Sequence, residues 1–274
     1  MQERQTYLEA ETATWPQARA YLARYPAAVL PLGATEQHGP HLPQGTDTFI
    51  AREICRRVVR RSIGYLLPAI PVSYSRVWSN AAGTAWVNSA TLKAFVKDIV
   101  RGMERTGVRA MLLFSGHSAN QQPLKELVRE LRDEGCRVAL LHGCLMGAEQ
   151  VLPEMESKLW RGTGELHAEE LETSLVLALR PELVKMELAA PDYPPAPPDF
   201  GHTVETMGDV MRTGVFGDPT RASVEKGERW LEIMANETAR LWVQFLRRHG
   251  IEVPEEGGTG GGPGDSVGPG TGEN

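Results

Sequence analysis

The chain has 274 residues, 41% apolar residues and a formal net charge of −6. No apolar run approaches the ~20 residues that a membrane span needs, and the polar N-terminus lacks the apolar segment of a secretory signal. Much of the net negative charge comes from residues 255–274, so the nearly neutral remainder argues against a nucleic-acid partner. Three cysteines without a metal-binding or disulfide pattern indicate reduced thiols. We therefore expect a cytoplasmic protein that binds neither membranes nor nucleic acids.

Short apolar runs alternate with segments of helical periodicity. Strands are predicted over residues 28–32, 65–70, 108–114 and 136–141, and helices over 47–58, 92–103, 124–131, 168–178 and 225–249. Strand, helix and strand at this spacing form βαβ units. The sequence therefore predicts an α/β fold with a mostly parallel central sheet.

The chain is expected to form one domain over residues 1–254, followed by an acidic Gly/Pro-rich tail over residues 255–274. The last eighteen residues hold nine glycines and almost no apolar side chain, so they cannot offset the entropy lost on ordering. Residues 190–200 are rich in proline and are predicted to form an extended surface loop.

Chemically active side chains cluster after the first predicted strand. A twelve-residue segment that contains glycine and proline carries four candidate ligands: Glu36, His38, His41 and Asp47. Carboxylate and imidazole groups together suit Zn²⁺, Mn²⁺ or Fe²⁺. The residues alone leave a second interpretation open, in which Asp47 caps the next helix and Glu36 is solvated.

Two later segments add candidates. His117 follows the strand over 108–114, where Gly116 permits close backbone approach, although a lone histidine there is more often structural. Glu172 lies between Leu171 and Leu175 near the buried side of a helix, where a carboxylate needs a partner such as a metal. The preceding acidic residues could instead complement the helix dipole.

Four segments together resemble the motifs of the creatininase (creatinine amidohydrolase) family. They are residues 31–47 (PLGATEQHGPHLPQGTD), 115–120 (SGHSAN), 167–174 (HAEELETS) and 217–227 (GDPTRASVEKG). They occur in the family's order over roughly residues 25–245, and the first is very specific.

The resemblance implies a three-layer α/β/α fold and a site for two divalent cations, with zinc as the first choice and manganese or iron as alternatives. The implied ligands are Glu36, His38, Asp47 and His117, with Asp47 bridging the two cations. His167 matches the active-site histidine of the family.

The fifth ligand is expected at a different place from that in creatininase. Creatininase has a glutamate two residues after the motif histidine, and this chain has Ala119 there. Many relatives keep a later glutamate instead, which corresponds to Glu172 here. Glu172 is therefore predicted as the fifth ligand and as a catalytic residue beside His167, with Glu170 as the second choice.

Other departures concern the substrate. Ser118 replaces a tyrosine of creatininase, Trp78 stands where many relatives have a histidine, and Ser75 is retained. Thr163 and Gly164 replace a Trp-Asp pair. Ser75, Trp78 and Ser118 are predicted to line the substrate pocket, and these changes argue against creatinine. For Trp78, Tyr74 and Trp86, ordinary core packing is an equally good interpretation.

The resemblance thus implies an amidohydrolase in which a metal-activated water cleaves a C–N bond of a cyclic amide, formamide or carboxamide. Two alternatives remain. One is a metallopeptidase of the mycofactocin-precursor-peptidase type, with a basic residue such as Arg76 near the peptide C-terminus. The other is a non-catalytic metal-binding paralogue. Relatives commonly form homo-oligomers, often hexamers, so self-association is expected.

Overall fold

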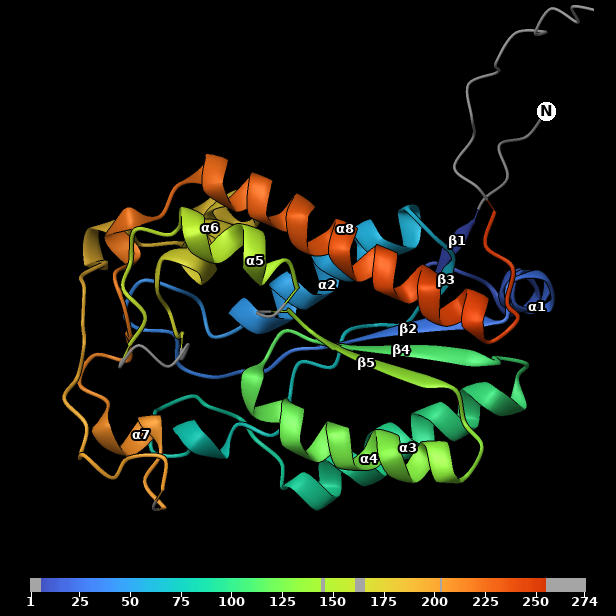
Figure 1. The fold of residues 1–274 in the computed structure, drawn as a ribbon, viewed down its shortest axis with the longest axis horizontal. Helices are drawn as coiled ribbons and strands as arrows, with labels where there is room; N and C mark the ends of the chain where they lie inside the picture. Colours follow the sequence, from blue (N-terminus) through green and yellow to red (C-terminus); the bar gives the residue numbers. More distant parts are fainter. Residues whose placement is uncertain (1–5, 144–145, 161–165, 203, 255–274) are drawn as a thin grey trace, which may run out of the picture.

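The computed structural model describes residues 6–143, 146–160, 166–202 and 204–254. Its centre is one five-stranded parallel sheet in the order β1-β3-β2-β4-β5 (Figure 1). The strands are β1 (Tyr7–Glu9), β2 (Ala27–Leu32), β3 (Gly64–Leu66), β4 (Ala110–Ser115) and β5 (Val138–His142). Every residue of β2 and β4 is buried, as their continuous apolar runs require at the centre of a sheet that is covered on both faces.

Helices cover both faces of the sheet. Figure 1 shows α2 (Thr46–Arg60), α5 (Ala148–Val151), α6 (Glu170–Leu179) and α8 (Val224–Arg248) on one face, with α3 (Ser89–Arg105) and α4 (Gln121–Asp133) on the other. Helix α1 (Trp15–Arg24) lies beside β1 and β3, and α7 (Met207–Val210) packs against the short 3-10 helix η1 (Arg76–Trp78). The predicted three-layer α/β/α fold is confirmed.

The remaining regular elements are short. They are the 3-10 helices η2 (Ser118–Asn120), η4 (Leu152–Glu154), η5 (Pro181–Leu183), η6 (Met186–Leu188) and η7 (Pro219–Arg221). None of the helices in the described part of the chain combines the length and the apolar character that a membrane crossing requires. The tail over 255–274 and Cys144, Thr163 and Gly164 lie outside the described residues.

Two hydrophobic clusters stabilise the described residues. The main core fills the space between the sheet and its helices, and large side chains such as Ile54, Trp230 and Trp242 are fully buried in it. Burial of each such side chain contributes roughly 1.5–3 kcal/mol. The second cluster is aromatic and consists of Trp78, Trp160, Phe200 and Phe216. It stabilises the loops beside the candidate site.

The structure differs from the elements predicted from the sequence in three places. The strand predicted over 65–70 ends at Leu66, because Pro68 lacks the N–H that would extend the ladder. Beyond it, Ile70 makes only an isolated bridge with Leu32. Strand β1 and helix α1 were not predicted, since β1 is very short and α1 buries only Tyr21 and Leu22.

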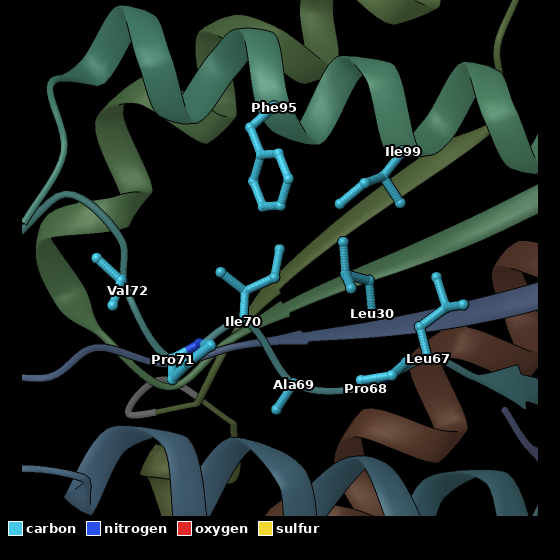
Figure 2. A pocket seen from close by; sticks show the side chains of 9 residues that line it. All are labelled: Leu30, Leu67, Pro68, Ala69, Ile70, Pro71, Val72, Phe95 and Ile99. Carbon is cyan, nitrogen blue, oxygen red and sulfur yellow. The ribbon is translucent and has the colours of Figure 1, made fainter. Parts of the chain in front are cut away.

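An apolar hollow of about 520 Å³ lies between α3 and the segment that follows β3 (Figure 2). Phe95 and Ile99 reach from α3 towards Leu30 and Ile70, and Phe95 is 51% exposed. None of the predicted site residues lines this hollow. The predicted site residues lie elsewhere, in the loops that follow the carboxyl ends of β2 and β4.

Candidate metal centre

Two glycines bring the loops after β2 and β4 onto the start of α2. A Cβ atom on Gly33 would lie 2.4 Å from the Cα atom of Thr48, and one on Gly116 would lie 2.5 Å from the carbonyl oxygen of Asp47. Neither contact is possible for a larger residue. Glycine at both positions therefore lets the two motif loops meet over the first turn of α2.

Asp47 occupies the centre of this meeting point. Helix α2 begins at Thr46, and its N-cap is Gly45 without a side-chain cap, so the capping interpretation of Asp47 is wrong. The Asp47 side chain is buried instead between two histidines. Its Oδ1 lies 3.2 Å from Nε2 of His38, and its Oδ2 lies 3.1 Å from Nδ1 of His117.

Two glutamates complete the cluster. Nε2 of His117 lies 3.3 Å from Oε2 of Glu36, and Nε2 of His38 lies 3.7 Å from Oε2 of Glu172. Three groups of side chains have potential ligand atoms within 4.8 Å of one another: Glu36–Asp47–His117, His38–Asp47–Glu172 and Glu36–His38–His167. Asp47 belongs to the first two. The structure thus brings together all five side chains predicted as ligands.

The unpaired atoms of the cluster fit a cation. Nε2 of His38 and Oδ2 of Asp47 are buried and make no hydrogen bond among the described residues, despite the short distances around them. Buried polar atoms without partners are rare and costly. A divalent transition-metal ion is bound by imidazole nitrogens and carboxylate oxygens that lie close together. These atoms are close together but do not hydrogen-bond to one another, so they are suited to hold such an ion.

The pKa values of the clustered side chains also favour a cation site. Burial raises the pKa of Glu36 to about 7 and also raises the pKa of Glu172. Burial by itself would lower the pKa of His38, but the carboxylates of Asp47 and Glu172 outweigh it and raise that pKa to about 10. His117 behaves similarly, with a pKa of about 9. The raised pKa values of His38 and His117 show how strongly the surrounding carboxylates favour positive charge at this place, as a cation site requires.

Glu170 and Glu172 point to different places. Oε1 of Glu170 lies 2.7 Å from Nζ of Lys226, and its Oε2 accepts hydrogen bonds from the backbone of Glu156 and Ser157. Oε2 of Glu172 accepts a hydrogen bond from the backbone N–H of Ala168 and lies beside His38. Ala168 has a φ of 51°, a left-handed conformation that is unusual for alanine. Glu170 is therefore engaged in an ion pair, and Glu172 faces the cluster.

His167 stands at the edge of the cluster. Its Nδ1 lies 3.9 Å from Oε1 of Glu36, and its ring stacks on Trp78 with 4.3 Å between ring centres. Its Nε2 lies 2.8 Å from both the carbonyl oxygen and the side-chain nitrogen of Gln37. Burial and the charge of His38 lower its pKa well below the usual range, so the imidazole is neutral.

A family model described as creatinine amidohydrolase matches residues 11–242. The chain belongs to the creatininase family. The predicted membership is thereby confirmed, at an identity that separates this chain from creatininase itself.

Three curated relatives show how varied the family's substrates are. Creatinine amidohydrolase of Pseudomonas putida is 32% identical over 239 residues, which are 80% of this chain and 90% of the relative. Mycofactocin precursor peptide peptidase of Mycobacterium ulcerans is 33% identical over 217 residues, which are 75% of this chain and 80% of the relative. 3-Dehydro-scyllo-inosose hydrolase of Thermotoga maritima is 25% identical and covers 90% and 86%, respectively.

Solved creatininase structures share the fold. A creatininase variant of the Zn-Zn type has a TM-score of 0.73 and 27% identity, and covers 86% of this chain and 97% of its own. A creatininase described with Mn has the same TM-score and identity, and covers 87% and 98%, respectively.

The three side chains predicted for the substrate pocket lie in different surroundings. Oγ of Ser75 hydrogen-bonds to Oε2 of Glu36 and lies 3.2 Å from Nε2 of His117. Trp78 is 2% exposed and covers His167, whereas Ser118 is exposed at the start of η2. Ser75 thus contacts two of the predicted ligands, and Trp78 packs on His167. The lining of a substrate pocket stays a prediction.

Two residues near the centre were given no role there by the sequence reasoning. Gln37 contacts His167, and Asn120 ties the loops together because its Oδ1 accepts a hydrogen bond from the backbone N–H of Tyr74. Asn120 is also the N-cap residue of α4, although its side chain makes no cap hydrogen bond. Both residues lie inside the family motifs, which is the signal that could have found them.

Proposed function

We propose that this protein is a metal-dependent amidohydrolase that hydrolyses a C–N bond of a small molecule such as a cyclic amide, a formamide or a carboxamide. The observation that carries the proposal is the Asp47 carboxylate, whose two oxygens each face a different histidine within a buried ligand set. Membership in the creatininase family supports it.

Asp47 is the shared ligand of two cations in this proposal. Glu36 and His117 would hold one cation with it, and His38 and Glu172 would hold the other. Zinc is the first choice, with manganese or iron as alternatives, because mixed imidazole and carboxylate sets suit all three. Bound there, the cations would supply Lewis acidity and lower the pKa of water towards ~7.

His167 moves the proton in this proposal. Its neutral ring presents Nδ1 towards Glu36, and Gln37 holds Nε2. Nδ1 can therefore take a proton from the attacking water and return it to the leaving nitrogen, a function typically worth ~10²–10⁴-fold in rate. Trp78 covers the ring and keeps bulk water from it.

A second candidate is peptide cleavage. The observations that favour it are the 33% identity to the mycobacterial peptidase and the exposed guanidinium of Arg76, which lies 5.9 Å from the centre of the Trp86 ring. A non-catalytic paralogue is disfavoured by the position of His167 against Glu36. We also propose that the protein self-associates and works in the cytoplasm, where its buried free thiols Cys55 and Cys136 stay reduced.

The test combines metal analysis with a substrate panel. We expect close to two equivalents of metal per chain, and turnover of a small amide that stops on chelation and returns on adding Zn²⁺, Mn²⁺ or Fe²⁺. The panel contains creatinine, formamides, lactams, carboxamides and short peptides. Turnover of the peptides alone would favour the second candidate. A protein that neither contains nor regains metal would refute the proposal.

A further inference from the structure

The start of α6 holds a buried carboxylate that the proposed function does not use. Glu169 is fully buried and stands in the chain between His167 and Glu172. Its Oε2 accepts a hydrogen bond of 2.8 Å from the backbone N–H of Leu171, and its Oε1 accepts one of 3.3 Å from the backbone N–H of Glu172. These two bonds offset part of the hydration that the carboxylate loses on burial.

The same two bonds make Glu169 the N-cap of α6. The first N–H groups of a helix have no partner within the helix, so an acceptor at this position fixes where the helix begins. The backbone of Glu169 contributes as well, because its carbonyl oxygen accepts a hydrogen bond of 2.9 Å from the N–H of Thr173. Both the side chain and the backbone of one residue therefore hold the first turn of α6.

Glu172 makes a hydrogen bond in the opposite direction. Its Oε2 accepts from the backbone N–H of Ala168, whose φ of 51° is unfavourable for alanine and has to be held by its surroundings. In a capping box the glutamate of the first turn reaches back to the N-cap residue. Here it reaches one residue further, so the hydrogen bonds of Glu169 and Glu172 close residues 168–172 into one unit.

Glu169 also packs against the segment that holds His167. A Cβ atom on Gly217 would lie 2.5 Å from the Cβ atom of Glu169, so only glycine lets the chain pass this close. The preceding residue, Phe216, donates its backbone N–H to the carbonyl oxygen of His167 at 2.9 Å. One connected unit therefore places both His167 and Glu172, and Glu169 lies in the middle of it.

We propose that Glu169 is a positioning residue, which fixes the turn of α6 from which Glu172 reaches the proposed metal centre. Glu169 is not a ligand itself, since none of the candidate ligand groups among the described residues includes it. The inference rests on the proposed function and deepens it, because it gives the three buried glutamates of this turn separate roles. Glu172 is the ligand, whereas Glu170 binds Nζ of Lys226.

Two neighbouring substitutions of the same kind test this role. Glutamine at residue 169 offers one acceptor oxygen to two N–H donors, and its own NH₂ group cannot accept. Groups that orient a metal ligand are typically worth ~10- to 100-fold in metal affinity. We therefore expect one zinc equivalent to bind about ten-fold more weakly in Glu169→Gln, and the other equivalent to bind as in the wild type. Competition with a chromogenic chelator measures both equivalents.

Glu170→Gln is the matched control, because it makes the same change in the next buried carboxylate. Chemical denaturation of the metal-free proteins should show a loss of stability in both variants, but only Glu169→Gln should lose zinc affinity. Glu169→Met, which keeps the length of the side chain and removes every acceptor, should weaken the same equivalent further. If Glu169→Met does not fold, the comparison of the two glutamine variants still decides the matter.

The positioning role and the proposed function can fail separately. Unchanged zinc affinity in Glu169→Gln, or an equal loss at both equivalents, would overturn the positioning role even if the wild type hydrolyses an amide. Selective loss of one equivalent in a protein that turns over no amide would retain the positioning role and contradict the hydrolase. A wild-type protein that binds no cation would refute both.

Discussion

His167 and Gln37 are joined through a single imidazole nitrogen. Nε2 of His167 lies 2.8 Å from the carbonyl oxygen of Gln37 and 2.8 Å from its side-chain nitrogen. A proton on Nε2 can be donated to the carbonyl oxygen, and a lone pair on Nε2 can accept from the amide. Gln37 therefore accommodates both neutral tautomers of His167, and Nδ1 on the side of Glu36 is free to accept or to donate a proton.

The first prediction concerns this pair. Gln37→Leu removes the amide donor and leaves the backbone carbonyl, so only the tautomer with a proton on Nε2 stays satisfied. We expect kcat to fall roughly 10- to 100-fold, part of the usual effect of proton transfer, with metal content unchanged. Gln44→Leu, on the same loop but bound to Ala82, is the control. An unchanged kcat in Gln37→Leu would contradict the relay.

The second prediction separates two neighbouring glutamates. Glu172→Gln should reduce bound metal by about one equivalent, because Glu172 faces His38 and Asp47. Glu170→Gln should keep both equivalents but lower the free energy of unfolding by about 2 kcal/mol, since it weakens a charge-assisted hydrogen bond from Lys226 to a buried carboxylate. Metal analysis and chemical denaturation of the two variants give the answer. Metal loss in Glu170→Gln alone would reverse the assignment.

The third prediction tests the support behind the ligands. Ser75 donates a hydrogen bond to Glu36 and fixes the direction of that carboxylate. Groups that orient a metal ligand in this way are typically worth ~10- to 100-fold in metal affinity, so Ser75→Ala should weaken zinc binding by about that factor. Ser73→Ala is the matched control, because Ser73 is equally buried but donates to the carbonyl oxygen of Gly33. Competition with a chromogenic chelator measures both, and equal affinities would remove Ser75 from the site.

The fourth prediction concerns acid stability. Burial, then the charge of His38, lowers the pKa of His41 to about 4, while Nε2 of His41 lies 2.9 Å from Oγ1 of Thr173. Between about pH 6.5 and 4 the unfolded chain binds a proton at this residue and the folded chain does not. The contribution of neutral His41 to the free energy of unfolding is therefore present above this pH window. It is lost as pH falls through the window, by an amount of order 2 kcal/mol.

A non-titrating variant isolates this effect. His41→Gln can still bond to Thr173 but takes up no proton in this range. The difference in unfolding free energy between pH 7 and pH 4.5 should be smaller in His41→Gln than in the wild type. Parallel pH profiles for the two proteins would show that His41 is not the residue that titrates.

The sequence predicted much of the fold and most of the candidate site, and particular residues show why. The motif loops are local: Glu36, His38 and Asp47 are close in the chain, and the end of a buried strand places them. The sequence decided less firmly which of Glu170 and Glu172 is the fifth ligand. Both lie in the first turn of α6, and only packing against Lys226 or His38 decides which one faces the cluster.

Sequence patterns do not reveal contacts between segments that are distant in the chain. The pairing of Gln37 with His167 spans 130 residues, and no periodicity marks a glutamine between two ligands. His142 is buried without a hydrogen-bond partner among the described residues, and no sequence pattern marks it. Short elements such as β1 were missed because three residues carry too little pattern to identify a strand.

The position of β2 and β4 in the sheet has a consequence for how the centre opens. The two motif loops follow the middle strands, which are paired on both sides and fully buried, while β1 and β5 form the edges. Local unfolding starts at edges and ends, and central strands open only with the whole molecule. In amide hydrogen exchange, β2 and β4 should therefore be the slowest segments. The framework that holds the ligands would then persist through every motion short of global unfolding.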